Sequence, residues 1–250
     1  PQIPLSSEDI AVTAKNCLAA GASMIHLHVR SANDTHSLSA ELYKQAITDT
    51  QKATDSGIFI QVTSEAVGIY SAEQQFKMIR TLKPAAVSIG IREIRHMDEQ
   101  LISQHFNFMR DTGIYPQLII YNHHDLAMYN DWLDRDVIPG NAYPILLVIG
   151  KKVAEGSFDN DILNPEFTSK LRASSWMVCA FGKNEYQTGK LAAKLGGHIR
   201  IGFENNCLLK SGDTASSNAE LISQMATYLK SQEYTLANIA QAKDIMRPDW

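Results

Sequence analysis

Seven short apolar segments, separated by helix-like stretches, constrain the fold of this chain more than any other feature. Each reads as a strand buried on both faces, which is typical of a parallel sheet covered by helices. Helices are predicted at 6–20 and 71–83, each of which begins with a serine followed three residues later by a polar residue, the spacing of a capping box. Further helices are predicted at 216–231 and 235–246. The predicted strands are residues 22–29, 58–64, 85–91, 117–122, 144–150, 175–182 and 198–204.

This alternation predicts an α/β fold, a TIM (β/α)8 barrel with its active site at the carboxyl ends of the strands. Because a helix precedes the first predicted strand, we expect the first barrel strand to lie before Pro1, missing from this sequence. The competing architecture is an open, doubly wound sheet. That fold typically has a glycine-rich, phosphate-binding turn after an early strand, and the sequence has none. With 250 residues and no linker, residues 1–250 are expected to form a single TIM-barrel domain.

Composition argues against several classes of partner. The formal net charge is -4 and there is no basic run, so nucleic acid is not expected. No apolar stretch is long enough to span a bilayer, and no signal peptide is visible. The three cysteines are far apart in the sequence, which indicates a reducing compartment, and we therefore expect a cytoplasmic protein.

The alternation of side chains along a strand predicts which polar groups face the barrel axis. In "MIHLHVR", residues 24–30, the aliphatic residues should face the helices, which turns His26 and His28 inward. The same rule turns Arg200 and Glu204 inward in the last predicted strand. In two of the strands between them, the inward polar residues are Gln61, Thr63, Glu65, Ser88 and Arg92.

His26, His28 and Glu204 are candidate metal ligands. Their two strands should be two strand spacings apart, roughly 10 Å between backbones, and long side chains can converge across that distance. Two imidazoles and one carboxylate with an open position make a catalytic zinc site. The alternative is structural: histidines satisfied by their neighbours, and Glu204 paired with Arg200.

Four segments, "GASMIHLHVR", "THSLSAELY", "GGHIRIGFENN" and "SNAELI", occur in an order that resembles the β-keto acid cleavage enzyme family (3-keto-5-aminohexanoate cleavage enzyme-like). The resemblance covers nearly the whole chain, and "QVTSEAVGIY" and "SIGIREI" resemble one subgroup. It implies a TIM barrel with one divalent metal, usually zinc, held by His26, His28 and Glu204. It also implies an acyltransferase, often a homotetramer, that converts a β-keto acid and acetyl-CoA into acetoacetate and a new acyl-CoA.

The resemblance implies roles for further residues. Arg200 matches a catalytic arginine that would stabilise developing oxyanion charge. Thr63 or Ser64 matches a hydroxyl that helps to hold the substrate. The turns after the last two barrel strands often hold phosphate in this fold, so Gly182 and Lys183 are expected to meet the CoA phosphates. The remaining substrate-binding candidates are Ser88, Arg92 and Asn205.

Two positions depart from the family pattern. Asn205 follows the metal-binding glutamate where many members have Asp, and Ile119 replaces a glutamate. Because Asn cannot act as a base, we hypothesise that Glu65 is the general base; an ion pair between Glu65 and Arg92 is the structural alternative. Two other functions stay open: a zinc-dependent hydrolase on a barrel scaffold, and a catalytically inactive barrel that binds a ligand.

Overall fold

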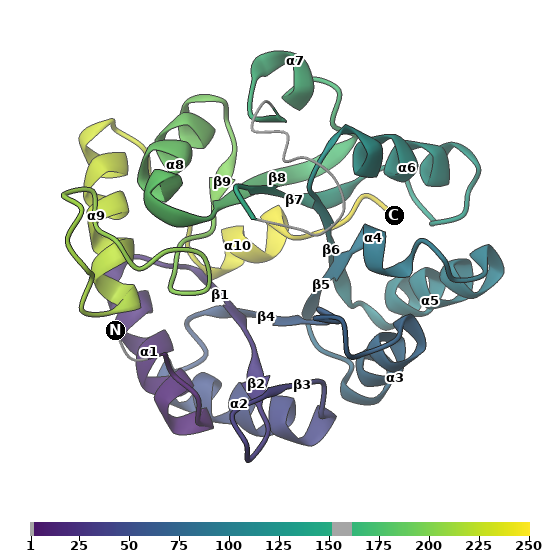
Figure 1. The fold of residues 1–250 in the computed structure, drawn as a ribbon, viewed down its shortest axis with the longest axis horizontal. Coiled ribbons are helices and arrows are strands. Elements are labelled where there is room, and N and C mark those ends of the chain that lie inside the picture. The colour runs from purple at the N-terminus through teal and green to yellow at the C-terminus, as the bar shows by residue number, and fades with distance from the viewer. Residues whose placement is uncertain (1–2, 152–161) are drawn as a thin grey trace.

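Seven parallel strands form a single curled sheet in the order β1-β4-β5-β6-β7-β8-β9 (Figure 1). The computed structural model describes residues 3–151 and 162–250. A separate antiparallel pair, β2 (Val29–Arg30) and β3 (His36–Ser37), follows the first strand. The strands of the main sheet are β1 (Met24–Leu27), β4 (Phe59–Thr63), β5 (Ala86–Gly90), β6 (Tyr115–Ile120), β7 (Tyr143–Ile149), β8 (Ala173–Ala180) and β9 (His198–Ile199).

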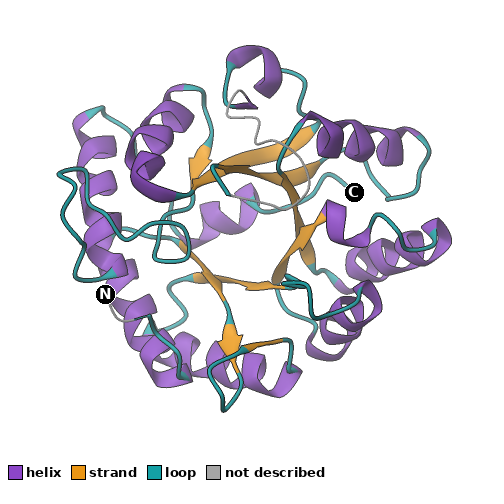
Figure 2. Ribbon diagram, viewed as in Figure 1, coloured by secondary structure: helices purple, strands orange, loops and turns teal. Residues whose placement is uncertain are grey.

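Helices surround this sheet on its outer face (Figure 2). Serine side chains start several of them: Ser6, Ser39 and Ser71 each accept the backbone N–H of the third helical residue. The helices are α1 (Ser7–Ala20), α2 (Ala40–Ala53), α3 (Ala72–Leu82), α4 (Ile91–Ile94), α5 (Glu99–Thr112), α6 (His123–Asp134), α7 (Pro165–Thr168), η2 (Gly182–Asn184), α8 (Glu185–Lys194), α9 (Asn218–Ser231) and α10 (Ile239–Ile245).

The core has two layers, one on each face of the sheet. In β7, Ile145, Leu147 and Ile149 belong to the large cluster shared with the helices, whereas Leu146 and Val148 belong to the cluster inside the barrel. Helix α10 lies across the inside of the ring in Figure 1 and contributes to that inner cluster. Buried apolar residues on both faces explain why the strand sequences are continuously apolar.

The barrel is open between β1 and β9, which form the two edges of the sheet. A cavity of about 580 Å³ lies there, lined by residues of both edge strands and of α1 and α9. The predicted α/β barrel of parallel strands is confirmed. No strand of the described residues pairs with the outer edge of β1 or β9, as expected for a barrel that lacks one strand.

Two predicted strands are shorter than expected. Strand β1 ends at Leu27, so His28 lies just beyond it, and β9 ends at Ile199 instead of continuing to residue 204. The chain turns after β9 because the side chain of Asn218 accepts the N–H of Phe203 at 2.8 Å. Glu204 therefore reaches the site from a turn, and the predicted strand geometry at this position is wrong. None of the helices in the described ranges combines the length and apolarity needed to cross a bilayer.

Candidate active site

Three side chains from the two edges of the open barrel converge into one cluster, as the sequence predicted. The Nε2 atoms of His26 and His28 are 3.1 Å apart. The Oε2 atom of Glu204 is 3.7 Å from His26 Nε2 and 3.4 Å from His28 Nε2. Ligand atoms about 2.0–2.2 Å from one tetrahedral zinc ion lie roughly 3.3–3.6 Å apart. The cluster therefore fits a single divalent metal in both ligand chemistry and spacing.

The side chain of Gln61, on β4, orients the imidazole of His26. The His26 Nδ1 atom is 2.8 Å from Gln61 Oε1, while Gln61 Nε2 donates to Gln117 Oε1 at 3.0 Å. Because an amide oxygen only accepts hydrogen bonds, His26 Nδ1 carries the proton and donates it. The lone pair of Nε2 is then directed at the cluster, which is the tautomer that a metal ligand needs.

The guanidinium of Arg200 lies beside the carboxylate of Glu204. Its Nη2 donates to Glu204 Oε1 at 2.9 Å, and its side chain is 16% exposed. Its Nε and Nη1 are buried and have no hydrogen-bond partner in the part of the chain that the structure describes. Since buried N–H groups are nearly always paired, these two donors point to a bound acceptor, such as an anionic ligand.

The electrostatics of the cluster favour metal binding. Burial, together with the positive charge of Arg200, lowers the pKa of His26 to about 3. Burial alone would raise the pKa of Glu204, but the charge of Arg200 and the hydrogen bond with His28 hold that pKa well below its ordinary value. At neutral pH, His26 is therefore neutral and Glu204 is ionised, the protonation states that metal ligands require.

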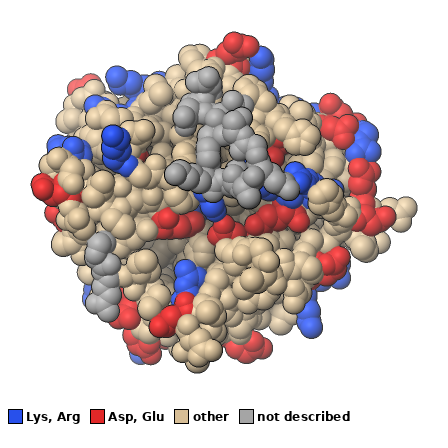
Figure 3. All heavy atoms as spheres, in the orientation of Figure 1, with Lys and Arg blue, Asp and Glu red and all other residues tan. Residues whose placement is uncertain are grey.

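A narrow cavity at the carboxyl ends of the strands is lined by residues of this cluster and by the charged pair Glu65 and Lys151. Lys151 Nζ is 2.6 Å from Glu65 Oε1, and the two side chains are 28% and 19% exposed. Figure 3 shows acidic and basic side chains next to one another in the hollow at the centre of this face. Glu65 lines this cavity together with His26, Arg200 and Glu204.

The hydroxyl groups predicted near the site have different environments. Thr63 and Ser88 line the narrow cavity, and Thr63 Oγ1 accepts the N–H of Glu65 at 3.0 Å. Ser64 is fully buried and its hydroxyl donates to the carbonyl of Ser88 at 2.8 Å. Of the two alternative substrate-holding residues, Thr63 is thus the one that reaches the cavity.

Arg92 belongs to a different contact than the one expected. Its Nη2 lies 2.6 Å from Asp125 Oδ2, and its guanidinium carbon lies 3.9 Å from the centre of the Tyr121 ring. The alternative prediction of an ion pair between Arg92 and Glu65 is wrong. Arg92 forms its ion pair with Asp125, at the start of α6, and Glu65 forms its ion pair with Lys151.

The turn that carries Glu204 is held by the buried carboxylate of Glu185, the first residue of α8. Glu185 accepts the N–H of Gly202 at 3.2 Å and the Nδ2 group of Asn206 at 3.1 Å. Burial raises the pKa of Glu185 to about 7, although these hydrogen bonds oppose the shift. Within the same turn, Asn205 is buried, and its Nδ2 has no hydrogen-bond partner among the described residues.

The predicted phosphate-binding residues lie at the start of the helical segment that follows β8. Gly182 has φ +77°, and its N–H donates to the carbonyl of Asn205 at 2.9 Å. Lys183 is exposed in the short helix η2. The two residues are therefore at the same rim as the cluster, because the turns after β8 and β9 meet through this hydrogen bond.

Sequence reasoning missed several residues of the site. Lys151 follows β7 by two positions, and a polar residue after an apolar strand is the signal that would have found it. Gln61 was predicted to face inward, but its hydrogen bond to His26 was not. The sequence gives no signal for Glu185, because its contacts with residues 202–206 depend on how α8 packs beside the turn.

The chain is similar to known proteins over nearly its whole length. A family model described as beta-keto acid cleavage enzyme matches residues 1–247. A 3-keto-5-aminohexanoate cleavage enzyme of Acetoanaerobium sticklandii is 27% identical over 254 residues, which cover 98% of this chain and 91% of that protein. A 3-oxoadipate:acetyl-CoA acetyltransferase of Cupriavidus necator is 26% identical over 259 residues, which cover 98% of this chain and 88% of that protein.

Among solved structures, the apo structure of ObcA is similar with a TM-score of 0.75 at 15% identity. The match covers 100% of this chain, which spans 66% of the length of that one. At this level of identity, the likeness concerns the fold, and it agrees with the barrel of parallel strands described above.

Proposed function

Because the chain belongs to the beta-keto acid cleavage enzyme family, we propose that it is an acyltransferase that converts a β-keto acid and acetyl-CoA into acetoacetate and a new acyl-CoA. The observation that carries the proposal is the meeting of His26, His28 and Glu204 beside the unpaired guanidinium donors of Arg200. The printed names of the Cupriavidus necator relative and of a 3,5-dioxohexanoate:acetyl-CoA acetone transferase support acetyl-CoA as co-substrate.

His26, His28 and Glu204 would hold the divalent metal, for which we propose zinc. The metal would supply Lewis-acid chemistry that acidifies the carbon between the keto and carboxylate groups. Glu204 also keeps Arg200 in place through their ion pair. Arg200 would then use Nε and Nη1, the two donor atoms without a partner among the described residues, to stabilise the oxyanion that develops at the reacting carbonyl.

Glu65 is our proposed general base. It lines the same cavity as His26, Glu204 and Arg200, and Asn205 cannot accept a proton in its place. The alternative family position is also apolar here, since Ile119 belongs to the inner core cluster. Thr63 would help to hold the substrate, because its side chain lies in the cavity and its hydroxyl already fixes the backbone of Glu65.

Further assignments complete the proposal. We propose Ser88 and Asn205 as substrate contacts, supported by the cavity position of the first and the unpaired amide of the second. Ser64 would position Ser88 by donating a hydrogen bond to its carbonyl, and Arg92 would position Tyr121 by packing against its ring. Gly182 and Lys183 are proposed to contact the CoA phosphates, because they begin the helical segment at the rim.

The remaining proposals concern the whole protein. We propose a single barrel domain over residues 1–250, supported by a family match that runs without a break over residues 1–247. We also propose a cytoplasmic homotetramer. The location is supported by three free cysteines, and the tetramer by the family resemblance.

The proposed function is tested by incubating the protein with acetyl-CoA and a panel of β-keto acids and detecting acyl-CoA species by mass spectrometry. We expect a new acyl-CoA together with acetoacetate, and loss of both when a chelator is added. Glu65→Gln should lower kcat by about 10²- to 10⁴-fold, the usual contribution of a general base. Glu99→Gln is the matched control, because Glu99 is exposed and pairs with Arg135.

Each alternative function has its own signature in this experiment. Keto acid cleaved without transfer to CoA would indicate a zinc-dependent hydrolase. Metal-loaded, folded protein that turns over none of the keto acids would indicate an inactive ligand-binding barrel. Full activity of Glu65→Gln would remove Glu65 as the base while leaving the acyl transfer intact.

A further inference from the structure

The ammonium group of Lys151 is held in the active-site cavity by two aromatic rings. Its Nζ lies 5.9 Å from the centre of the Tyr121 ring and 5.6 Å from the centre of the Phe181 ring. These rings follow β6 and β8, the two strands on either side of β7. Because both rings attract a cation at this distance, they stabilise the position of the ammonium independently of any carboxylate.

Lys151 is also paired with Glu65, and it stays charged. Burial alone would lower the pKa of Lys151, but Tyr121 and Glu65 outweigh burial and raise that pKa above its ordinary value. The ammonium has three N–H donors, and the hydrogen bond at 2.6 Å to Glu65 uses one of them. The described residues therefore leave part of its donor capacity for another acceptor.

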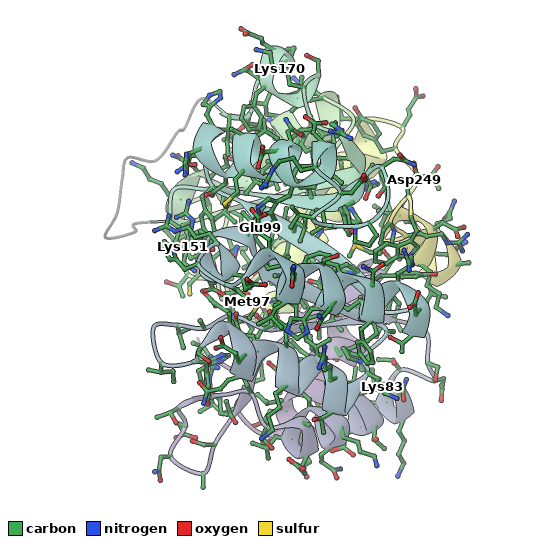
Figure 4. The ribbon with its side chains drawn as sticks, turned by 90° about the vertical axis from the view of Figure 1, so that its right-hand side faces the viewer. Lys83, Met97, Glu99, Lys151, Lys170 and Asp249 are labelled. Carbon is green, nitrogen blue, oxygen red and sulfur yellow. The ribbon has the colours of Figure 1, made fainter. Side chains whose placement is uncertain are left out.

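The position of Lys151 places this cation within reach of a bound substrate. Lys151 lines the same narrow cavity as His26, Glu204 and Arg200. Figure 4 shows Lys151 on one side of the molecule, whereas Lys83 and Asp249 lie toward the other. Lys151 and Arg200 thus contribute two separate cations to the lining of the same small space beside the cluster.

We propose that Lys151 determines substrate specificity by binding a second carboxylate at the distal end of the β-keto acid, an inference that rests on the proposed function. A distal carboxylate would replace Glu65 as partner of the ammonium, so that Lys151 stays paired when the substrate enters. An uncharged distal group would displace Glu65 without replacing its charge. The exchange would also release the carboxylate of Glu65 toward the reacting carbon.

The surroundings favour an anionic over a cationic distal group. A distal ammonium would have to displace Lys151 from Glu65, although Tyr121 and Phe181 continue to hold the lysine in the cavity. The two ammonium groups would then repel each other at short range. The structure thus offers a stable place for the lysine cation with or without Glu65, and a new carboxylate can use it.

The test compares Lys151→Met with the unchanged protein on three keto acids: 3-oxoadipate, 3-oxohexanoate and 3-keto-5-aminohexanoate. We expect the variant to raise KM for 3-oxoadipate by about 10- to 100-fold, in line with the loss of a close charge pair. The KM values for 3-oxohexanoate and acetyl-CoA should change little. Lys151→Arg should restore most of the preference, and Lys170→Met is the matched control because Lys170 is exposed and pairs with Glu166.

The result that would overturn the proposal is an equal change for all three keto acids, or a rise in KM for acetyl-CoA alone, which would assign the cation to CoA. Failure of the proposed function is distinguished by calorimetric titration of 3-oxoadipate and 3-oxohexanoate without acetyl-CoA. If no protein turns over any keto acid, selective weakening of 3-oxoadipate binding by Lys151→Met still supports the inference, and equal binding of both variants refutes it.

Discussion

At the scale of the residue, the most informative contact is the hydrogen bond between His26 and Gln61. It fixes the proton on Nδ1 and leaves Nε2 for a metal, while Gln61 is itself fixed by Gln117. The two amides are fully buried, so neither can be replaced by water without rearrangement. The orientation of a proposed metal ligand thus depends on a chain of amides inside the barrel.

This contact predicts the effect of Gln61→Leu. Loss of the acceptor should lower zinc affinity by about 10- to 100-fold, as for other partners of metal-bound histidines. Affinity is measured by competition with a coloured chelator, without reference to turnover. Gln117→Leu is the comparison variant, because it keeps the His26–Gln61 hydrogen bond and removes only the partner that fixes Gln61, so its loss of zinc affinity should be smaller. Equal losses in the two variants would contradict the assignment.

At the scale of the element, helices α8 and α9 determine where the Glu204 turn lies. Glu185 at the start of α8 accepts hydrogen bonds from Gly202 and Asn206, and Asn218 at the start of α9 accepts the N–H of Phe203. Both acceptors belong to the first residue of a helix. The turn is therefore positioned by helix packing in place of the strand that the sequence predicted.

The raised pKa of Glu185 predicts a pH dependence of stability. Burial favours the neutral form in the folded protein, so its contribution is fully present below the ordinary carboxyl pKa of 4.5 and is lost as the pH rises through about 7. Between about pH 4.5 and about pH 7, the unchanged protein should lose up to about 3 kcal/mol of unfolding free energy relative to Glu185→Gln.

Urea unfolding of the metal-free proteins at several pH values measures this difference. Contributions from groups that are present in both proteins cancel in the comparison. Glu233→Gln is the control, because Glu233 is exposed and should show no such trend. A difference between Glu185→Gln and the unchanged protein that does not vary with pH would contradict the shifted pKa.

At the scale of the whole molecule, the described residues leave both edges of the sheet unpaired, with a cavity between them. Central strands such as β6 and β7 have hydrogen-bonded neighbours on both sides, whereas β1 and β9 have one neighbour among the described residues. The cavity of about 580 Å³ removes packing partners from the same edges. Among the described residues, the side that carries the proposed metal ligands therefore has fewer hydrogen-bonding and packing partners than the rest of the sheet.

Hydrogen exchange should reveal this asymmetry. In the metal-free protein, the ladder amides of β6 and β7 should exchange at least about tenfold more slowly than those of β1 and β9, because edge strands open at a lower free energy. Mass-spectrometric or NMR exchange measures it. Addition of zinc should slow exchange in β1 selectively, since two proposed ligands lie on or next to it; uniform protection across the sheet would be inconsistent with the open barrel.

Local sequence patterns were enough to predict the alternation of strands and helices, the barrel of parallel strands, and the inward positions of His26, Gln61, Thr63 and Glu65. These predictions follow from local rules: a continuous apolar run indicates a strand buried on both faces, and successive side chains of a strand point to opposite faces. The family resemblance and the three candidate metal ligands were equally visible in the residues, because they depend on which residue types occur in which order.

The pairing of the charged groups could be seen only in the folded chain. Lys151 pairs with Glu65 and Asp125 with Arg92, although all four residues are far apart in the sequence. Glu204 reaches the cluster from a turn, because helix packing at Glu185 and Asn218 bends the chain there. Pairing and packing of this kind depend on distances between elements, to a fraction of an ångström, which local sequence patterns do not encode.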